Sequence, residues 1–201
     1  MVITKRMNKI LLLQDVTKIE LKISSNELLD AEMYCRSNQE KFYIPASKKI
    51  VDARVEATFL IDEGYKCVSE MKEDVDFNVL RILEVYKRMN TEYPYVHPLN
   101  IYVRDGEYKF LFPCNFSTNF KKCSLISQLK VLIYSLYSDE EYERIEKHRR
   151  TFLKQSESEF FNKIEKSRDI DGLIKVCLRN QEIKKLQQQK KKIRFFKRGK
   201  E

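Results

Sequence analysis

The protein has 201 residues, of which 42% are hydrophobic and 34% are charged. This composition is typical of a globular protein with one domain or two small lobes, and it excludes a disordered chain. No run of residues approaches the ~20 apolar residues that cross a bilayer. The apolar stretch from Ile10 to Leu13 is too short for the core of a signal peptide, so we expect no export signal.

The net charge of +9 is concentrated at one end of the chain. Nine of the 39 basic residues and one of the 30 acidic residues lie between Lys184 and Glu201. The preceding 183 residues therefore hold 30 basic and 29 acidic residues, a net charge of +1. A nearly neutral body with a basic tail argues against a nucleic-acid-binding face that covers the whole domain.

Five cysteines are scattered along the chain without a Cys-x-x-Cys pair: Cys35, Cys67, Cys114, Cys123 and Cys177. With only two histidines beside them, this pattern predicts no zinc site, and we expect no metal or cofactor. We interpret the thiols as the reduced cysteines of a cytosolic protein. Cys67 and Cys177 have apolar neighbours and are expected to be small core residues.

The first part of the chain, residues 9–72, has the pattern of strands and turns. Apolar and polar residues alternate around Leu21 and around Phe59, which is the period of a half-buried strand. A short helix is expected over Ser25–Met33. A strand is expected over Lys41–Ala46, stopped by Pro45 and the polar residues 47–49. A hairpin turn at 62–64 is expected to lead into a strand over Tyr65–Met71. Gly64 would supply the positive φ of that turn.

From Asp76 onward the apolar residues recur every three or four positions, which predicts helices. The first helix begins at Asp76 and must end before Pro94. A short hairpin is expected from Ile101 to Phe112, with Asp105-Gly106 as its turn. Further helices are expected over residues 124–137, 139–153, 157–166 and 169–180.

A β-rich start followed by a helical finish predicts an α+β fold with two lobes, as in a protein kinase. The predicted boundaries are residues 1–75 for a small β-rich N-lobe, 76–182 for a helical C-lobe and 183–201 for a basic tail.

The segment between the first helix and the hairpin has the outline of a protein-kinase catalytic loop. In an active kinase this loop supplies a base Asp and, five residues later, an Asn that holds Mg²⁺. If Asn100 is aligned with that Asn, Tyr95 takes the place of the base and His97 the place of the usual Lys. A phenol with a pKa of ~10 is a poor general base at neutral pH, so the loop lacks the catalytic base of a kinase.

The other parts of a kinase active site are also missing from the sequence. Its four glycines are too scattered to form a glycine-rich phosphate loop. The stretch after the hairpin, Phe112 to Phe116, has no carboxylate where the metal-binding Asp should stand. Phosphoryl transfer depends on positioned Mg²⁺ and charge, so we expect no enzyme activity. A residual small-molecule kinase is the weakest alternative.

We interpret Tyr95, His97, Pro98 and Asn100 as a structural loop. His97 stands between Pro94 and Pro98, in a rigid turn that orders the start of the hairpin. The Asn100 amide can bond neighbouring backbone without any metal nearby. The open alternative for His97 is a relic nucleotide contact or a proton carrier.

Five segments between Val79 and Lys197 follow one another in a characteristic order. They are the helix end Tyr86–Met89, the loop His97–Tyr102, the apolar helix Gln128–Leu136, the helical hairpin around Ile170–Ile174 and the lysine-rich end Lys190–Lys197. In this order and spacing they resemble the cytosolic pseudokinase domain of the EssB/YukC family. Members of that family are membrane subunits of the type VII secretion system of Gram-positive bacteria.

The resemblance implies a non-catalytic scaffold or docking domain that supports assembly of the export machine. It implies a place on the cytoplasmic side of the cell membrane, one membrane span following residue 201, and a homodimer in the full-length protein. The implied partners are other subunits of the system, namely its motor ATPase and its small ubiquitin-like cytosolic subunit.

The basic tail has three interpretations. Its lysines are interleaved with Phe195 and Phe196, so they could bind nucleic acid, lie on an anionic membrane or form the cytoplasmic flank of a membrane span. The resemblance favours the third interpretation, with no nucleic-acid partner. The runner-up is a free-standing cytosolic module that uses the tail on nucleic acid or anionic membrane. The membrane-proximal basic residues are Lys190, Lys191, Lys192, Arg194, Lys197 and Arg198.

Overall fold

The computed structural model describes residues 2–7, 10–13, 18–24, 42, 46–51, 54–61, 64–71, 73–89, 96–110, 124–138 and 140–198. For residues 191–198, and for the described residues before Ile61 other than Phe42, it describes the backbone alone. The chain divides into two compact units, Met1–Lys72 with Met89–Gln128, and Glu73–Arg88 with Leu129–Glu201. The helix predicted over Ser25–Met33 lies outside the described residues.

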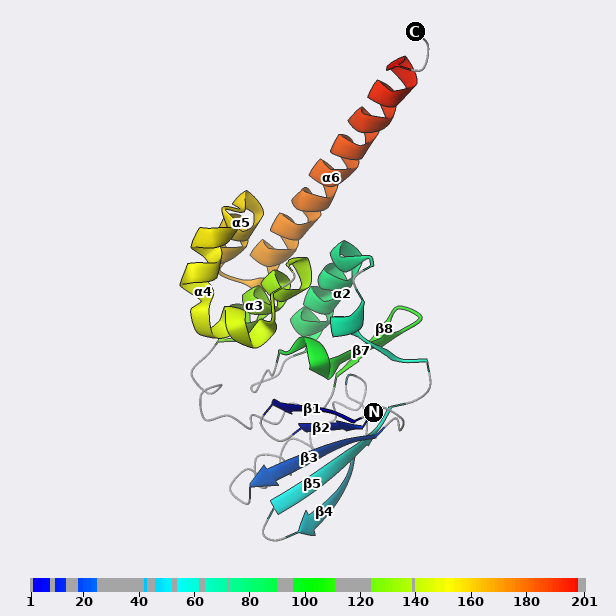
Figure 1. The fold of residues 1–201 in the computed structure, drawn as a ribbon, viewed down its shortest axis with the longest axis vertical. Helices are drawn as coiled ribbons and strands as arrows, with labels where there is room; N and C mark the ends of the chain where they lie inside the picture. The colour runs from blue at the N-terminus through cyan, green and yellow to red at the C-terminus, as the bar shows by residue number, and fades with distance from the viewer. Residues whose placement is uncertain are drawn as a thin grey trace. The chain divides into compact units, whose positions relative to one another are not determined.

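The first unit contains a five-stranded antiparallel sheet with the strand order β1-β2-β3-β5-β4 (Figure 1). Its strands are β1 (Val2–Met7), β2 (Ile10–Leu13), β3 (Lys18–Ser24), β4 (Ala46–Val51) and β5 (Arg54–Leu60). The two strands predicted from alternation, around Leu21 and Phe59, are confirmed as β3 and β5. They pair directly with each other, with Leu21 opposite Ala57 and Ile19 opposite Phe59.

Of the strand predicted over Lys41–Ala46, only Phe42 and Ala46 belong to the described residues, and the prediction is wrong at Phe42. Phe42 lies in a turn, and β4 begins only at Ala46, so it contains the polar residues that were taken as a stop. Lys48 and Lys49 lie in this strand, which ends the strand order of the described sheet. Edge strands commonly carry lysine because charge there discourages pairing with other chains. The residue composition of an edge strand can therefore resemble that of a loop.

A second, three-stranded antiparallel sheet in the same unit has the order β6-β7-β8. Its hairpin, β7 (Ile101–Arg104) and β8 (Glu107–Phe110), confirms the prediction. Asp105 and Gly106 both have positive φ, 51° and 78°, as the two central residues of a type I′ turn require. This hairpin groups with the β-rich unit, whereas the predicted boundaries assign it to the helical lobe.

The strand predicted over Tyr65–Met71 is wrong in length and in pairing. Only β6 (Lys66–Cys67) is extended, and a 3-10 helix, η1 (Val68–Glu70), follows it. β6 pairs with β7, so residues 62–64 do not join two neighbouring strands of one sheet. Gly64 does have the expected positive φ, 94°.

The helices expected after Asp76 are confirmed, with shifted ends. They are α2 (Val75–Arg88), α3 (Leu125–Tyr137), α4 (Tyr142–Ser156), α5 (Glu159–Lys166) and α6 (Ile170–Arg198). Serine side chains cap two of them, because Ser124 Oγ accepts the Ser127 N–H at 3.2 Å and Ser158 Oγ accepts the Phe161 N–H at 3.3 Å. These bonds satisfy helix N–H groups that have no partner inside the helix.

The core of the second unit forms around α3, the helix that the sequence predicted to be apolar on nearly all sides. Leu129, Ile133 and Tyr134 on α3 are at most 1% exposed. The Tyr134 ring lies 5.1 Å from that of Phe161 on α5 and 5.6 Å from that of Phe152 on α4. Such offset aromatic pairs add to the free energy gained by burial, so α3 holds α4 and α5 together.

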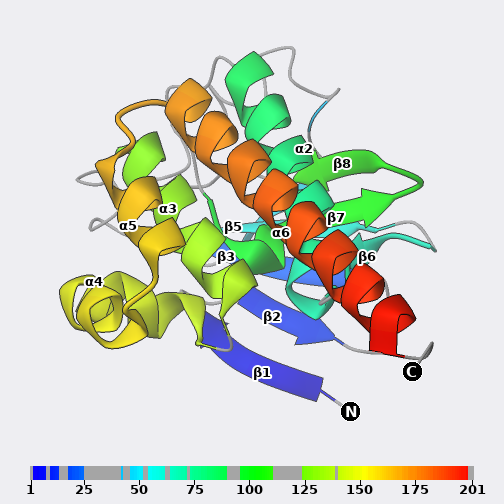
Figure 2. The same cartoon turned by 90° about the horizontal axis from the view of Figure 1, so that it is seen from above.

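α6 lies alongside α2 and α5, and its C-terminal half extends past both of them (Figures 1 and 2). The predicted helix end at residue 180 is wrong: the helix continues through the basic tail to Arg198. Lysine, arginine and glutamine are good helix formers, so the polar composition does not stop the helix. No helix among the described residues is both long enough and apolar enough to cross a membrane.

Candidate functional site

The degenerate kinase-like loop is built around a 3-10 helix, η2 (Pro98–Asn100). His97 precedes this helix in an extended conformation, and its Nδ1 accepts a hydrogen bond from the Leu99 N–H at 3.1 Å. The Asn100 N–H donates to the His97 carbonyl at 2.9 Å. Pro98 at the first helical position has a φ that suits a helix start and no N–H that needs a partner. His97 thus acts as the N-cap of the loop.

Two buried contacts fix this loop within the first unit. The Val96 N–H donates to Gln128 Oε1 at 3.0 Å, and the Cys67 thiol donates to the Pro98 carbonyl at 3.4 Å. Burial raises the pKa of the Cys67 thiol, which keeps it protonated and able to donate. The loop is therefore held from both β6 and the start of α3.

The side chains of the loop are withdrawn from solvent. His97 is 2% exposed and Asn100 is 3% exposed, and Pro98 is also buried. The burial of His97 and Asn100 is compatible with the structural role expected for them, which stays a prediction. Tyr95, at the position of the kinase base, lies outside the described residues, as do residues 111–123, where the metal-binding Asp would stand.

Among the described residues, no group of three or more His, Cys, Asp or Glu side chains could hold a metal ion. The cysteines at 35, 114 and 123 are outside those parts. Cys67 and Cys177 are free thiols, and both are buried. Burial raises the pKa of Cys177 to about 12, as expected for a core residue.

The predicted basic residues share one helix. Residues 182–190 of α6, including Lys190, are all exposed. Five further basic residues lie on the described backbone of α6, although their side chains are outside the described part: Lys191, Lys192, Arg194, Lys197 and Arg198. The tail is thus a helical extension of the second unit, where the sequence predicted a separate segment.

Three residues on three helices anchor the middle of α6, and we call them the Asp76 cluster: Asp76, Tyr137 and Lys184. Asp76 Oδ1 accepts the Tyr137 hydroxyl at 2.5 Å and the Lys184 ammonium at 2.9 Å. The ammonium also lies 4.9 Å from the centre of the Tyr137 ring, in a cation–π contact. Burial and the bond to Asp76 both raise the pKa of Tyr137, so its hydroxyl stays a donor.

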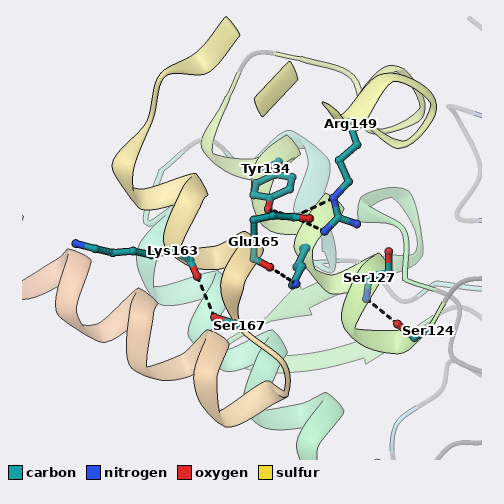
Figure 3. Close-up of polar contacts among 8 residues, drawn as sticks. Ser124, Ser127, Tyr134, Arg149, Lys163, Glu165 and Ser167 are labelled. Atoms are coloured by element: carbon teal, nitrogen blue, oxygen red, sulfur yellow. Dashed lines mark hydrogen bonds and ion pairs between the residues drawn. The ribbon is translucent and has the colours of Figure 1, made fainter. Parts of the chain in front are cut away.

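A second polar network joins α3, α4 and α5 (Figure 3). Glu165 on α5 accepts the Tyr134 hydroxyl at 2.7 Å and forms an ion pair with Arg149 on α4. Lys130 on α3 donates to the Glu165 backbone carbonyl at 2.6 Å, at the C-terminal end of α5, where a positive charge is favourable. This network ties together the helices that the aromatic core already holds.

Sequence reasoning missed both the Asp76 cluster and the Glu165 network. Their members are far apart in the chain, since Lys184 lies 108 positions after Asp76 and Glu165 lies 31 positions after Tyr134. Neither set forms a local motif. The available signal was weak: the sequence marks Asp76 only as the start of a helix, and the residues of α3 only as an apolar helix.

No protein-family model and no curated protein matches the sequence. Solved structures do share its fold. The cytoplasmic fragment of EssB from Geobacillus thermodenitrificans matches 86% of this chain and 88% of the fragment, with a TM-score of 0.64 and 11% identity. The cytoplasmic fragment of EssB from Staphylococcus aureus matches 80% of this chain and 98% of the fragment, with a TM-score of 0.57 and 14% identity.

These matches bear on the fold, since both identities are far below the level at which function carries over. The chain has the α+β fold of an EssB cytoplasmic fragment. The resemblance predicted from the loop, the apolar helix and the lysine-rich end is thereby confirmed at the level of the fold.

Proposed function

We propose that this chain is the cytoplasmic domain of an EssB-family subunit of a type VII secretion system. The observation that carries this proposal is the extent of the structural match, which covers 80% or more of this chain and 88% or more of the two EssB fragments. A chance likeness of single motifs would not extend over both the β-rich and the helical unit. The resemblance in sequence order, read from the same residues, points to the same family.

In this proposal α6 leads toward the membrane. Residues 182–190 of this helix are exposed, and its sequence is basic from Lys184 to Arg198, as expected for the cytoplasmic flank of a membrane span following residue 201. The domain would then lie on the cytoplasmic side of the cell membrane, and the full-length protein would be a homodimer. The projecting helix would act as a spacer between the span and the second unit.

The domain would be a two-lobed pseudokinase that works as a scaffold and not as an enzyme. The sequence places Tyr95 where a kinase needs its base, and the loop partners His97 and Asn100 are buried. Its partners would be the motor ATPase of the system and the small ubiquitin-like cytosolic subunit. The docking of these subunits needs a binding surface and no catalytic residues, so a domain with degenerate kinase motifs can perform it.

Deletion of the gene in its host tests the proposed function. We expect a defined set of proteins to disappear from the culture supernatant, measured by quantitative mass spectrometry, and to return when the full-length gene is restored. Proteins exported by the general secretory pathway serve as the control and should not change. An unchanged supernatant, or the protein found wholly outside the membrane fraction, would contradict the proposal.

Thermal unfolding with and without millimolar Mg·ATP tests the absence of a nucleotide site. A ligand that binds the native state raises the midpoint of unfolding by mass action. We expect no shift, because no carboxylate stands at either kinase position. A rise of several degrees, together with measurable ATP turnover, would make the loop an active site.

A further inference from the structure

The half of α6 that extends past α2 and α5 exposes apolar side chains (Figures 1 and 2). Four large apolar side chains are exposed among those that the structure describes, and three of them lie on α6: Leu178, Ile183 and Leu186. Single exposed apolar residues are ordinary on a protein surface. Ile183 and Leu186, however, are 42% and 56% exposed and stand three positions apart, so they share one face of the helix.

The apolar positions on this face have the spacing of a coiled coil. Ile193 follows Leu186 by one heptad on the same helix, so Ile183 falls at an a position and Leu186 and Ile193 at d positions. Lys190 takes the second a position, and we call these four positions the α6 seam. The polar residues Gln187 and Gln189 flank it. A stripe restricted to a and d positions is typical of a helix that pairs with one other helix, whereas a helix that lies on a core has a wider apolar face.

The charge around the α6 seam is positive, and neighbouring acids do not cancel it. Seven basic residues and no acidic residue lie from Lys185 to Arg198. Lys184 already pairs with Asp76 and is left out of this count. The exposed carboxylates to set against this charge lie on α6 or at the starts of α2 and α5, which α6 packs against: Glu73, Asp74, Glu157 and Glu182. Seven positive charges less these four negative ones still leave +3, so the seam attracts an acidic partner.

We propose that the α6 seam pairs with an acidic amphipathic helix of a partner protein. The apolar side chains of that helix lie against Ile183, Leu186 and Ile193, and its flanking carboxylates lie beside the basic residues of α6. A second copy of this chain does not suit the seam, because Lys190 and the other cations of one copy would face those of the other. The pairing follows from the residues of α6 alone and does not depend on membership of a secretion system.

The length of the exposed helix limits the size of this interface. Residues 182–198 span about 25 Å of helix, which is little more than two heptads. An interface of this size is small, so the complex should form and dissociate readily. A helical peptide of similar length is therefore a suitable probe.

The probe is a fluorescein-labelled peptide of three heptads, with Leu at its a and d positions and Glu at its e and g positions. Fluorescence anisotropy with the whole chain measures binding, and circular dichroism of the mixture measures the helix that the peptide gains. We expect saturable binding with a gain of helix. A peptide of the same composition in scrambled order keeps the charge without the apolar stripe, and should bind about tenfold more weakly.

Two apolar variants locate the binding face. Ile183→Gln combined with Leu186→Gln removes the exposed apolar part of the α6 seam and keeps good helix formers, so the fold should persist while binding weakens about tenfold or more. Leu178→Gln is the matched control. It replaces an apolar side chain of similar exposure, 45%, at a position of α6 outside the seam, so binding should not change.

Two charge reversals separate the seam from the overall charge of the chain. Lys190→Glu should weaken binding about fivefold, because it places a carboxylate at the centre of the seam. Arg150→Glu makes the same change of charge on the exposed surface of α4 and should leave binding unchanged. Equal effects of the two reversals would mean that general attraction between opposite charges causes the binding, which contradicts the proposal.

Three further results would overturn the proposal. The first is equal binding of the ordered and the scrambled peptide, and the second is unchanged binding in the double variant of Ile183 and Leu186. The third is failure of the ordered peptide to bind while the same double variant abolishes another association of the chain. Self-association in sedimentation velocity would then assign the seam to a second copy, and co-sedimentation with phosphatidylserine vesicles would assign it to a membrane surface.

Discussion

His97 shows how a residue at a kinase-like position can have a purely local task. Its Nδ1 accepts the Leu99 N–H, and its carbonyl accepts the Asn100 N–H, so it binds the backbone of the last two residues of η2. An imidazole that accepts at Nδ1 must be unprotonated there. The same loop in an active kinase needs exposed polar groups, whereas His97 in this loop is buried and binds neighbouring backbone.

Replacement of His97 by Ala should remove the cap and leave a gap in a buried site. We expect the free energy of unfolding to fall by about 1–2 kcal/mol from the lost cap, and by more if the cavity does not collapse. His97→Asn keeps a side-chain acceptor and should retain more of the stability. Denaturant unfolding of the two variants checks this, and equal stability of His97→Ala and the wild type would rule out the structural role.

Glu165 is the acidic centre of the network on α3, α4 and α5. Burial raises its pKa, but the hydrogen bonds from Tyr134 and Arg149 and the positive charge of Arg149 outweigh that effect and hold the pKa below its ordinary value. A carboxylate whose pKa is lower in the folded state stabilises the fold above its unfolded pKa of about 4.3. This contribution is lost as the pH falls through the folded-state pKa.

Glu165→Gln should therefore lower the free energy of unfolding at neutral pH. We expect a loss of about 1 kcal/mol, because the side chain is 40% exposed and solvent screens the ion pair. The difference from the wild type should shrink as the pH falls below about 4. Glu159→Gln, on the same helix but with a solvent-exposed ion pair, is the control and should change little. A pH-independent difference would show that the carboxylate charge is not the cause.

At the scale of single residues, the sequence predicts what depends on neighbours in the chain. The Asp105-Gly106 turn and the positive φ of Gly64 both follow from local chemistry, and both are observed. The partners of Glu165 depend on how distant helices meet, and the bend of α4 lies at His148, where the backbone leaves the helical region. No spacing in the sequence marks His148 as the bend, because nothing around it is a Pro or a Gly.

At the scale of elements, two of the errors have a common cause. The strand β4 and the C-terminal half of α6 are both rich in lysine, and polar composition was taken as the end of an element. Lysine ends neither structure: it is accepted on edge strands and is a good helix former. Helices with an apolar stripe, such as α2, were predicted well because burial repeats at the helical period.

The Asp76 cluster determines where α6 leaves the rest of the second unit. α2 and α6 run antiparallel, with Lys87 paired to Asp171 at 2.6 Å near one end and Asp76 paired to Lys184 near the other. Both pairs are partly exposed, so each contributes at most about 1 kcal/mol. The second pair is the more consequential, because Tyr137 joins it and the exposed part of α6 begins there.

Lys184→Met keeps the aliphatic stem of the side chain and removes the charge. We expect the fold to persist while the amides of α6 around residue 184 exchange with solvent up to about fivefold faster, the effect of losing about 1 kcal/mol of local stability. Hydrogen exchange followed by mass spectrometry resolves this segment. Lys185→Met, at the exposed neighbouring position, is the control, and equal exchange in both variants would mean that the cluster does not hold the helix.

At the scale of the whole molecule, the sequence predicts an α+β chain, and the observed fold agrees. The β-rich start and the helical finish are visible in the pattern because a period of two changes to one of three and four near Asp76. The units themselves are not contiguous in the chain, since α2 groups with the last helices and the hairpin β7–β8 with the first strands. Chain order alone does not reveal such an exchange.

Removal of residues 190–201 should take away most of the positive charge of the chain and leave its fold intact. The removed segment holds seven basic residues and one acidic residue, so the net charge falls from +9 to +3. Lys190 and the eight residues before it are exposed, and α6 meets the Asp76 cluster already at Lys184, so the thermal midpoint should not change. Attraction to anionic surfaces should be lost, since each Lys or Arg near such a surface contributes about 1 kcal/mol.

Co-sedimentation with phosphatidylserine vesicles at low and high salt, beside a titration with duplex DNA, measures this attraction. We expect the full chain to bind the vesicles at low salt and the shortened chain to remain in the supernatant, because the rest of the molecule is nearly neutral. A shortened chain that still bound DNA tightly would place the basic surface in the body of the protein. That result would favour the nucleic-acid module over a membrane-proximal helix.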